Sequence, residues 1–217
     1  VERSRGLGDV YKRQLMDHVG SGSAYDLSKR RSNLSILPPY DGKAFSSFVE
    51  TIYNMHGYIE HCREEYVLIS QGNVITNIDY TDVFDFHSKK KADITLIYKN
   101  HAIPQGYDRP ITLDVDNDGK VNQIFVKPGV VDKEVFNHAY GSILIKKDIL
   151  MSEIRNAISV NQLDVKRLLQ SSLGKYSIYA YENKGYCAAI SSINDYFEFN
   201  MDCLLYTSDA ADEEDSV

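Results

Sequence analysis

The sequence has 217 residues, a net charge of −7 and three cysteines, which together exclude several classes of protein. No apolar run reaches the roughly 18 residues that a membrane-spanning helix needs, and the excess of acid argues against broad binding to nucleic acid or to anionic lipid. Cys62, Cys187 and Cys203 follow no disulfide or zinc spacing, so we expect a reducing, cytoplasmic environment.

The two ends differ from the middle. Residues 1–14 are basic without an apolar period, and residues 203–217 finish in an acidic run, as a frayed arm and a solvated tail do. Both stretches also resemble translated sequencing adapters. We therefore predict adapter-like ends at 1–14 and 203–217 and a partial domain over 15–202, which would be an internal piece of a longer protein.

The middle predicts alternating strands and helices. Short runs rich in β-branched and aromatic residues predict strands at 34–40, 65–70, 92–99, 111–116, 120–127, 139–145 and 176–181. Helical spacing of apolar residues predicts helices at 44–61, 79–91, 147–159, 164–173 and 192–202. Such alternation, with an inserted hairpin, predicts an α/β domain with a mixed, mainly parallel sheet.

Local signals refine two of these elements. Asp79 is a helix cap, and we expect the helix that it starts to turn Val83, Phe84 and His87 inward. His87 is then a hydrogen-bonded core residue rather than a catalyst. Asn117-Asp118-Gly119 predicts a tight hairpin turn, where positive φ costs little.

One tempting motif fails on its spacing. Residues 114–119 match the first half of an EF-hand loop, but that loop needs a bidentate glutamate at its twelfth position, which here is Phe125. The hairpin is therefore the preferred interpretation. Gln71-Gly72-Asn73 is more promising, because it follows a predicted buried strand at the edge where open α/β sheets bind ligands. Asn73 is neutral there, where a magnesium site would present a carboxylate.

Several stretches carry a family resemblance. Residues 57–99 (GYIEHCREEYVLISQGNVITNIDYTDVFDFHSKKKADITLIYK), 15–27, 34–40 and 193–204 resemble bacterial glucose-1-phosphate adenylyltransferases. HVGSGSAYDL and SILPPY resemble the regulatory, GlgD-type subunit more than the catalytic one. The resemblance implies a nucleotide-diphospho-sugar transferase domain, Rossmann-like with a mixed, mainly parallel sheet, truncated at both ends. It also implies a role in glycogen biosynthesis.

Both metal-binding positions of that family are changed in this sequence. Catalytic members hold magnesium with an aspartate in an SGDHIYKMDY-like motif and another in a GYWRDVGT-like motif. The matching stretches are 71–80 and 185–192, so Asn73 and Ala189 replace the two aspartates. We therefore expect no catalytic residues and no metal or other cofactor in this subunit, and magnesium in its catalytic partner.

The sequence indicates the residues that would bind the sugar phosphate less clearly. Lys127 matches the lysine of an FVEKP-like segment that contacts the sugar phosphate in the family, although Val126 replaces the acidic residue before it, and Gly141 matches the glycine of an SMGIY-like segment. We take Lys127 and Gly141 as substrate-binding candidates. An equally good interpretation makes Lys127 a surface lysine after a strand.

The resemblance implies a regulatory, catalytically inactive subunit that forms a hetero-oligomer with a catalytic subunit and supports ADP-glucose synthesis from ATP and glucose 1-phosphate. We expect it to bind sugar phosphates, but neither nucleic acid nor a membrane. Two alternatives stay open. The first is an active nucleotidyltransferase with a rearranged metal site, for which Asp79 or Glu182 are candidates, and the second is a stand-alone sugar-phosphate sensor.

Overall fold

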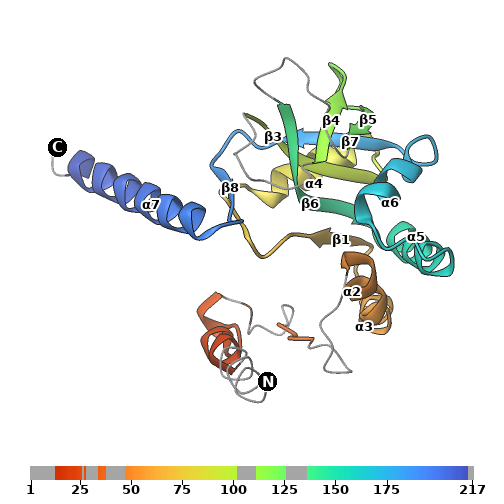
Figure 1. The fold of residues 1–217 in the computed structure, drawn as a ribbon, viewed down its shortest axis with the longest axis horizontal. Coiled ribbons are helices and arrows are strands. Elements are labelled where there is room, and N and C mark those ends of the chain that lie inside the picture. The colour runs from red at the N-terminus through yellow and green to blue at the C-terminus, as the bar shows by residue number, and fades with distance from the viewer. Residues whose placement is uncertain are drawn as a thin grey trace. The chain divides into compact units, whose positions relative to one another are not determined.

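The computed structural model describes residues 13–25, 27, 34–37, 47–101, 111–125 and 136–214 (Figure 1). The chain divides into two compact units, residues 1–45 and 46–217. In the first unit, a helical segment covers residues 13–19, and a 3-10 turn, η1, covers Ser23–Tyr25. The predicted strand over 34–40 is wrong in its described part: residues 34–37 have no regular structure, because no described strand pairs with them.

The second unit alternates helices with strands. Its described helices are α2 (Phe48–Asn54), α3 (His56–His61), α4 (Tyr80–Lys90), α5 (Lys147–Ser159), α6 (Val165–Ser172) and α7 (Ile193–Glu214). Its described strands are β1 (Tyr66–Ile69), β2 (Val74–Thr76), β3 (Ile94–His101), β4 (Ile111–Val115), β5 (Val121–Phe125), β6 (Phe136–Lys146), β7 (Ile178–Glu182) and β8 (Cys187–Ala189). The predicted helix over 44–61 is divided at Met55, whose ψ of 4° leaves the helical region, and α7 runs past the predicted end at residue 202.

Six of the described strands form one sheet, in the order β5-β4-β6-β3-β7 with β1 also on β6 (Figure 1). The long strand β6 is its centre. One edge of β6 pairs with β3 along most of its length. The other edge pairs first with β4, through His138 and Ala139, and then with β1, from Ile143 to Lys146. A separate two-stranded ribbon is formed by β2 and β8.

The α/β class and the mixed sheet are confirmed, but the predicted parallel majority is wrong for the described strands. Among them, β3 and β7 form the one parallel pair, and β6 runs antiparallel to β1, β3 and β4. A parallel neighbour needs a crossover of a dozen or more residues, usually a helix. The short turn between β4 and β5 gives an antiparallel pair, and β6 joins the other edge of β4 antiparallel as well.

The sheet is covered on both faces. Leu96 of β3 and Ile143 and Ile145 of β6 pack into a large core with apolar residues of α2, α3, α5 and α6. The intervening residues Ile97 and Leu144 face the other way and form a smaller core with Val83 of α4. Since side chains alternate across a strand, these two clusters make three layers, with helices on either side of the sheet.

The helix and turn signals of the sequence are confirmed in detail. The Asp79 carboxylate accepts a hydrogen bond from the Thr81 amide at 2.8 Å and caps the start of α4, and Lys91, the residue after the helix, has a left-handed conformation. Val83 and His87 are buried, as predicted, whereas Phe84 is 41% exposed and lies at the rim of the core instead.

The hairpin interpretation of residues 114–119 is also confirmed. The carboxylate of Asp116 accepts hydrogen bonds from the amides of Asp118 and Lys120, each at 2.9 Å, and Gly119 supplies the positive φ of 86°. The acidic residue is therefore used to close the turn, as an Asx side chain commonly is.

His87 makes the stability of this fold depend on pH. It is 1% exposed, its Nδ1 lies 2.8 Å from the Thr95 hydroxyl, and burial, aided by the cation of Lys146, lowers its pKa against a smaller opposing effect of Asp93. The unfolded chain takes up a proton near pH 6.5 that the folded chain resists, so the free energy of unfolding should fall below that pH, by at most about 1.4 kcal/mol per pH unit.

Urea unfolding between pH 5 and pH 8 checks this expectation. The wild-type chain should lose stability below about pH 6.5, and His87→Gln should show a shallower loss over the same range, because the buried titrating group is gone. Equal slopes for the two proteins would contradict the assignment of the pH dependence to His87.

Candidate functional site

A ribbon that the sequence did not reveal brings together positions 73 and 189, which the family resemblance assigns to metal ligands. Strands β2 and β8 pair antiparallel, and Val74 lies opposite Ala189. Asn73, one residue before Val74, is joined to the residue after Ala189: its backbone oxygen accepts the amide of Ile190 at 2.8 Å. Positions 73 and 189, more than a hundred residues apart in the sequence, thus sit at the same end of one ribbon.

The side chains at these positions do not fit a magnesium ion. Magnesium prefers carboxylate and water oxygens in octahedral geometry. Ala189 has no donor atom, and the Asn73 amide nitrogen donates to the Ile190 backbone oxygen at 3.0 Å, which ties its side chain to the ribbon. In the part of the chain that the structure describes, no three His, Cys, Asp or Glu residues are grouped so that they could hold a metal.

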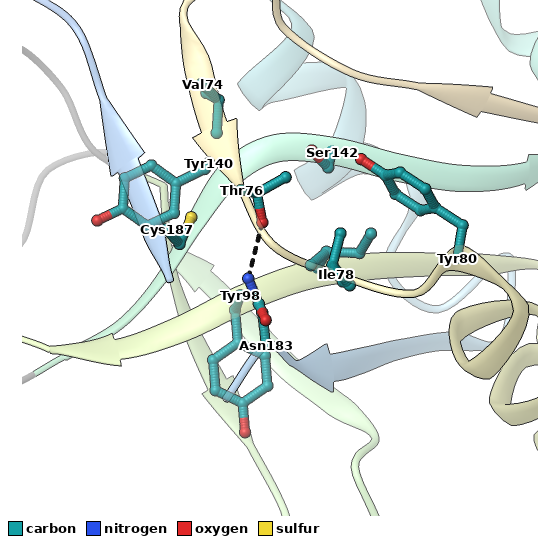
Figure 2. A pocket seen from close by; sticks show the side chains of 10 residues that line it. Val74, Thr76, Ile78, Tyr80, Tyr98, Tyr140, Ser142, Asn183 and Cys187 are labelled. Atoms are coloured by element: carbon teal, nitrogen blue, oxygen red, sulfur yellow. Dashed lines mark hydrogen bonds between the residues drawn. The ribbon is translucent and has the colours of Figure 1, made fainter. Parts of the chain in front are cut away.

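Asn183 fastens the ribbon to the sheet. This residue follows β7, is 4% exposed, and its amide nitrogen donates to the Thr76 hydroxyl of β2 at 2.8 Å (Figure 2). The same nitrogen lies 3.3 Å from the Tyr186 backbone oxygen, and the side-chain oxygen accepts the Gly185 amide at 2.9 Å. Its own backbone amide donates to Tyr98 of β3. One buried residue, called the clamp below, therefore links β2 and the β7–β8 turn through its side chain and β3 through its backbone, and both polar atoms of the side chain are satisfied.

The turn between β7 and β8 is packed tightly against the end of β2. The Asn77 amide donates to the Tyr186 backbone oxygen at 2.9 Å, and the Lys99 ammonium donates to the Gly185 backbone oxygen. A Cβ at position 185 would collide with the backbone oxygen of Asn77. Glycine is required there because the two backbones approach each other closely.

A small pocket lies between the ribbon and the sheet. Figure 2 shows its lining, which includes Thr76, Tyr98 and Cys187 around the Asn183 clamp. Its volume of about 10 Å³ is close to the minimum that holds one water molecule, so it is not a site for a sugar or a nucleotide. Burial raises the pKa of the Cys187 thiol, which therefore stays protonated and unreactive near neutral pH.

A wider groove lies beside the clamp, bounded by α4, by the β4–β5 turn and by the segment that leaves β7. Its volume of about 630 Å³ is in the range of small-molecule sites. Asp79 and Glu182, the two candidates for a rearranged metal site, both line it. Asp79 is already engaged as the cap of α4, and the hydrogen bonds that it accepts from Thr81 lower its pKa. Lys90 and Asp118 form an ion pair of 2.6 Å in the same groove.

Of the two substrate-binding candidates, Gly141 lies within the described residues and Lys127 does not. Gly141 lies in β6 with φ of 81°, where the pairing of β6 with β3 shifts register. It is close to the strand-end loop, because the Ser142 hydroxyl lies 3.3 Å from that of Ser70. Lys127 lies outside the described residues. The structure thus groups Asn73, Ala189 and Gly141 around the loop after β1, as far as the described residues allow.

Comparisons with known proteins find relatives of one name. The chain is 31% identical to a glucose-1-phosphate adenylyltransferase of Clostridium acetobutylicum over 200 residues, 88% of this chain and 51% of that protein. It is 28% identical to the Bacillus subtilis protein of the same name over 203 residues, 88% of this chain and 52% of that protein. These similarities support the family resemblance. The chain spans about half the length of the curated relatives it matches.

A solved structure supports the fold. The crystal structure of HddC from Yersinia pseudotuberculosis matches with a TM-score of 0.53 and 14% identity, over 85% of this chain and 71% of that one. At this identity the match concerns the fold alone. No protein-family model matches the sequence. In the described residues, no helix is long and apolar enough to cross a membrane.

We expect Asn183→Ala to destabilise the chain by about 1–3 kcal/mol, because it leaves partly buried partners of the amide unsatisfied and a space where the buried side chain lay. Asn200→Ala is a matched control: its amide donates to the Tyr196 backbone oxygen on an exposed face of α7, so its loss should change stability by less than about 0.5 kcal/mol. Urea unfolding measures both variants. Equal effects at the two positions would contradict the clamp.

Two glycines give a second matched pair. Gly185→Ala should destabilise the chain, since the added Cβ meets the Asn77 backbone, whereas Gly72→Ala meets nothing within 4 Å and should be nearly neutral. We expect a difference of at least about 1 kcal/mol between them, as for other overpacked sites. Thermal unfolding of the two variants would show equal midpoints if the β7–β8 turn were loosely packed.

Proposed function

We propose that the chain is the nucleotidyltransferase-like part of a regulatory, catalytically inactive glucose-1-phosphate adenylyltransferase subunit. The support for the family is the similarity to proteins of that name over 88% of the chain. The observation that supports the regulatory assignment is that Asn73 and Ala189, neither of which offers a carboxylate, lie at the same end of the ribbon of β2 and β8.

The chemistry explains why these two residues matter. Adenylyl transfer joins ATP to the phosphate of glucose 1-phosphate and releases pyrophosphate, so several anionic oxygens crowd together in the transition state. Metal ions neutralise much of this charge. One absent ligand can be replaced by water, but two absent carboxylates leave the metal without a protein anchor. We expect this loss to lower turnover by several orders of magnitude.

Such a subunit acts through a partner. In this proposal it forms a hetero-oligomer with a catalytic glucose-1-phosphate adenylyltransferase subunit that holds the magnesium, and it tunes the formation of ADP-glucose for glycogen biosynthesis in the cytoplasm. Sugar phosphates are its proposed small-molecule ligands.

The test is ADP-glucose formation by the full-length subunit alone. We expect turnover at least about a thousandfold below that of the catalytic subunit, since one oxyanion-stabilising contact alone accounts for a hundredfold to a thousandfold. Mixing the two purified subunits should change the activity of the catalytic one. Turnover comparable to the catalytic subunit would overturn the proposal and favour a rearranged metal site.

Restoring the carboxylates provides the complementary experiment. Asn73→Asp with Ala189→Asp should give a magnesium-dependent gain of ADP-glucose formation, because the ribbon already holds the two positions together. Ala189 is 6% exposed, so the double variant is first checked for folding by its thermal midpoint. Asn73→Asp alone, at an exposed position, should bind magnesium weakly and gives a second measurement if the double variant is unstable.

A further inference from the structure

The sheet has a gap beside Gly141. β6 pairs with β4 up to Ala139 and with β1 from Ile143 onward, and Gly141 lies between these two partners. On the opposite edge, Leu96 faces Ile143 and Tyr98 faces Ala139, so the bulge of β6 stands opposite Ile97. Bulges of this kind re-aim the chain and are common next to binding sites.

The side chain of Gln71 fills this gap. A Cβ at position 141 would lie 2.6 Å from Cδ and 3.0 Å from Cγ of Gln71, which is closer than carbon atoms can pack. The carboxamide therefore rests directly on the Cα of Gly141. This contact uses both the positive φ and the missing side chain of the glycine.

The loop that carries Gln71 is held at both ends. Ser70, just before it, has its hydroxyl 3.3 Å from that of Ser142 on the bulge. Asn73, two residues after it, is joined to Ile190 by one backbone and one side-chain hydrogen bond. Gln71 thus lies between two anchors, on the same loop as the first substituted metal position and against the candidate sugar-phosphate residue.

We propose that Gln71 is a specificity-determining residue that weakens sugar-phosphate binding at this site: its side chain occupies part of the space over Gly141 that the ligand would use, and a small residue at position 71 would let the ligand bind more tightly. The proposal rests on the proposed function, which supplies the ligand class. Gln71 is exposed, so its removal opens a hollow to solvent rather than a buried cavity, and the fold should tolerate it.

The experiment is binding of glucose 1-phosphate to the full-length subunit, measured by isothermal titration calorimetry. Gln71→Ser and Gln71→Ala should bind at least about tenfold more tightly than the wild-type protein, a difference of about 1.4 kcal/mol. Gln71→Met is the matched control, because it keeps the length of the side chain without its polar group. It should leave the affinity near that of the wild type, with all thermal midpoints similar.

Two outcomes would overturn the proposal. Unchanged affinity in Gln71→Ser and Gln71→Ala would show that the gap is not the ligand's place. Weaker binding in all three variants would make the carboxamide a ligand-binding group instead of a barrier. Neither outcome touches the proposed function, which fails separately if the wild-type subunit alone makes ADP-glucose at the rate of the catalytic one.

Discussion

The buried amide of Asn183 is the constraint on which the geometry of the site depends. The ribbon of β2 and β8 pairs with no other described strand, and three-residue strands are too short to be stable alone. Asn183 supplies the missing attachment, since it bonds to β2, to the β7–β8 turn and, through its backbone, to β3. Because Asn183 is buried and its hydrogen bonds are partly buried, leaving them unmade would cost free energy, and this cost favours one position of the ribbon.

The frame of the site is built from backbone, whereas its chemistry would come from side chains. The pairing of Val74 with Ala189 and the bond between Asn73 and Ile190 depend on main-chain atoms, which any residue at 73 or 189 can provide. A carboxylate or a neutral side chain at these two positions would therefore leave the backbone pairing of the ribbon unchanged. The same reasoning explains how a domain can keep the shape of an enzyme while serving as a regulatory partner, as we propose.

Much of the fold could be predicted from the sequence, because its signals are local. The cap at Asp79, the turn closed by Asp116 and the inward side of Val83 and His87 follow from residue type and spacing. Strand direction could not be predicted in this way, since it depends on which strands meet in the sheet. The ribbon of β2 and β8 was not predicted because its strands are only three residues long. All three residues of Val74–Thr76 are β-branched, which could have indicated the first strand.

Only part of the candidate site could therefore be predicted from the sequence. Positions 73, 189 and 141 could be named from motifs, but Asn183 and Gln71 act through contacts that no motif records. Asn183 also lines both the small pocket and the wide groove, together with Tyr98, so the two hollows share one wall. A change that displaces this amide must alter both of them and the ribbon at once. Residues of this kind are found by tracing the partners of buried polar groups, since a buried amide is retained where its hydrogen bonds are needed.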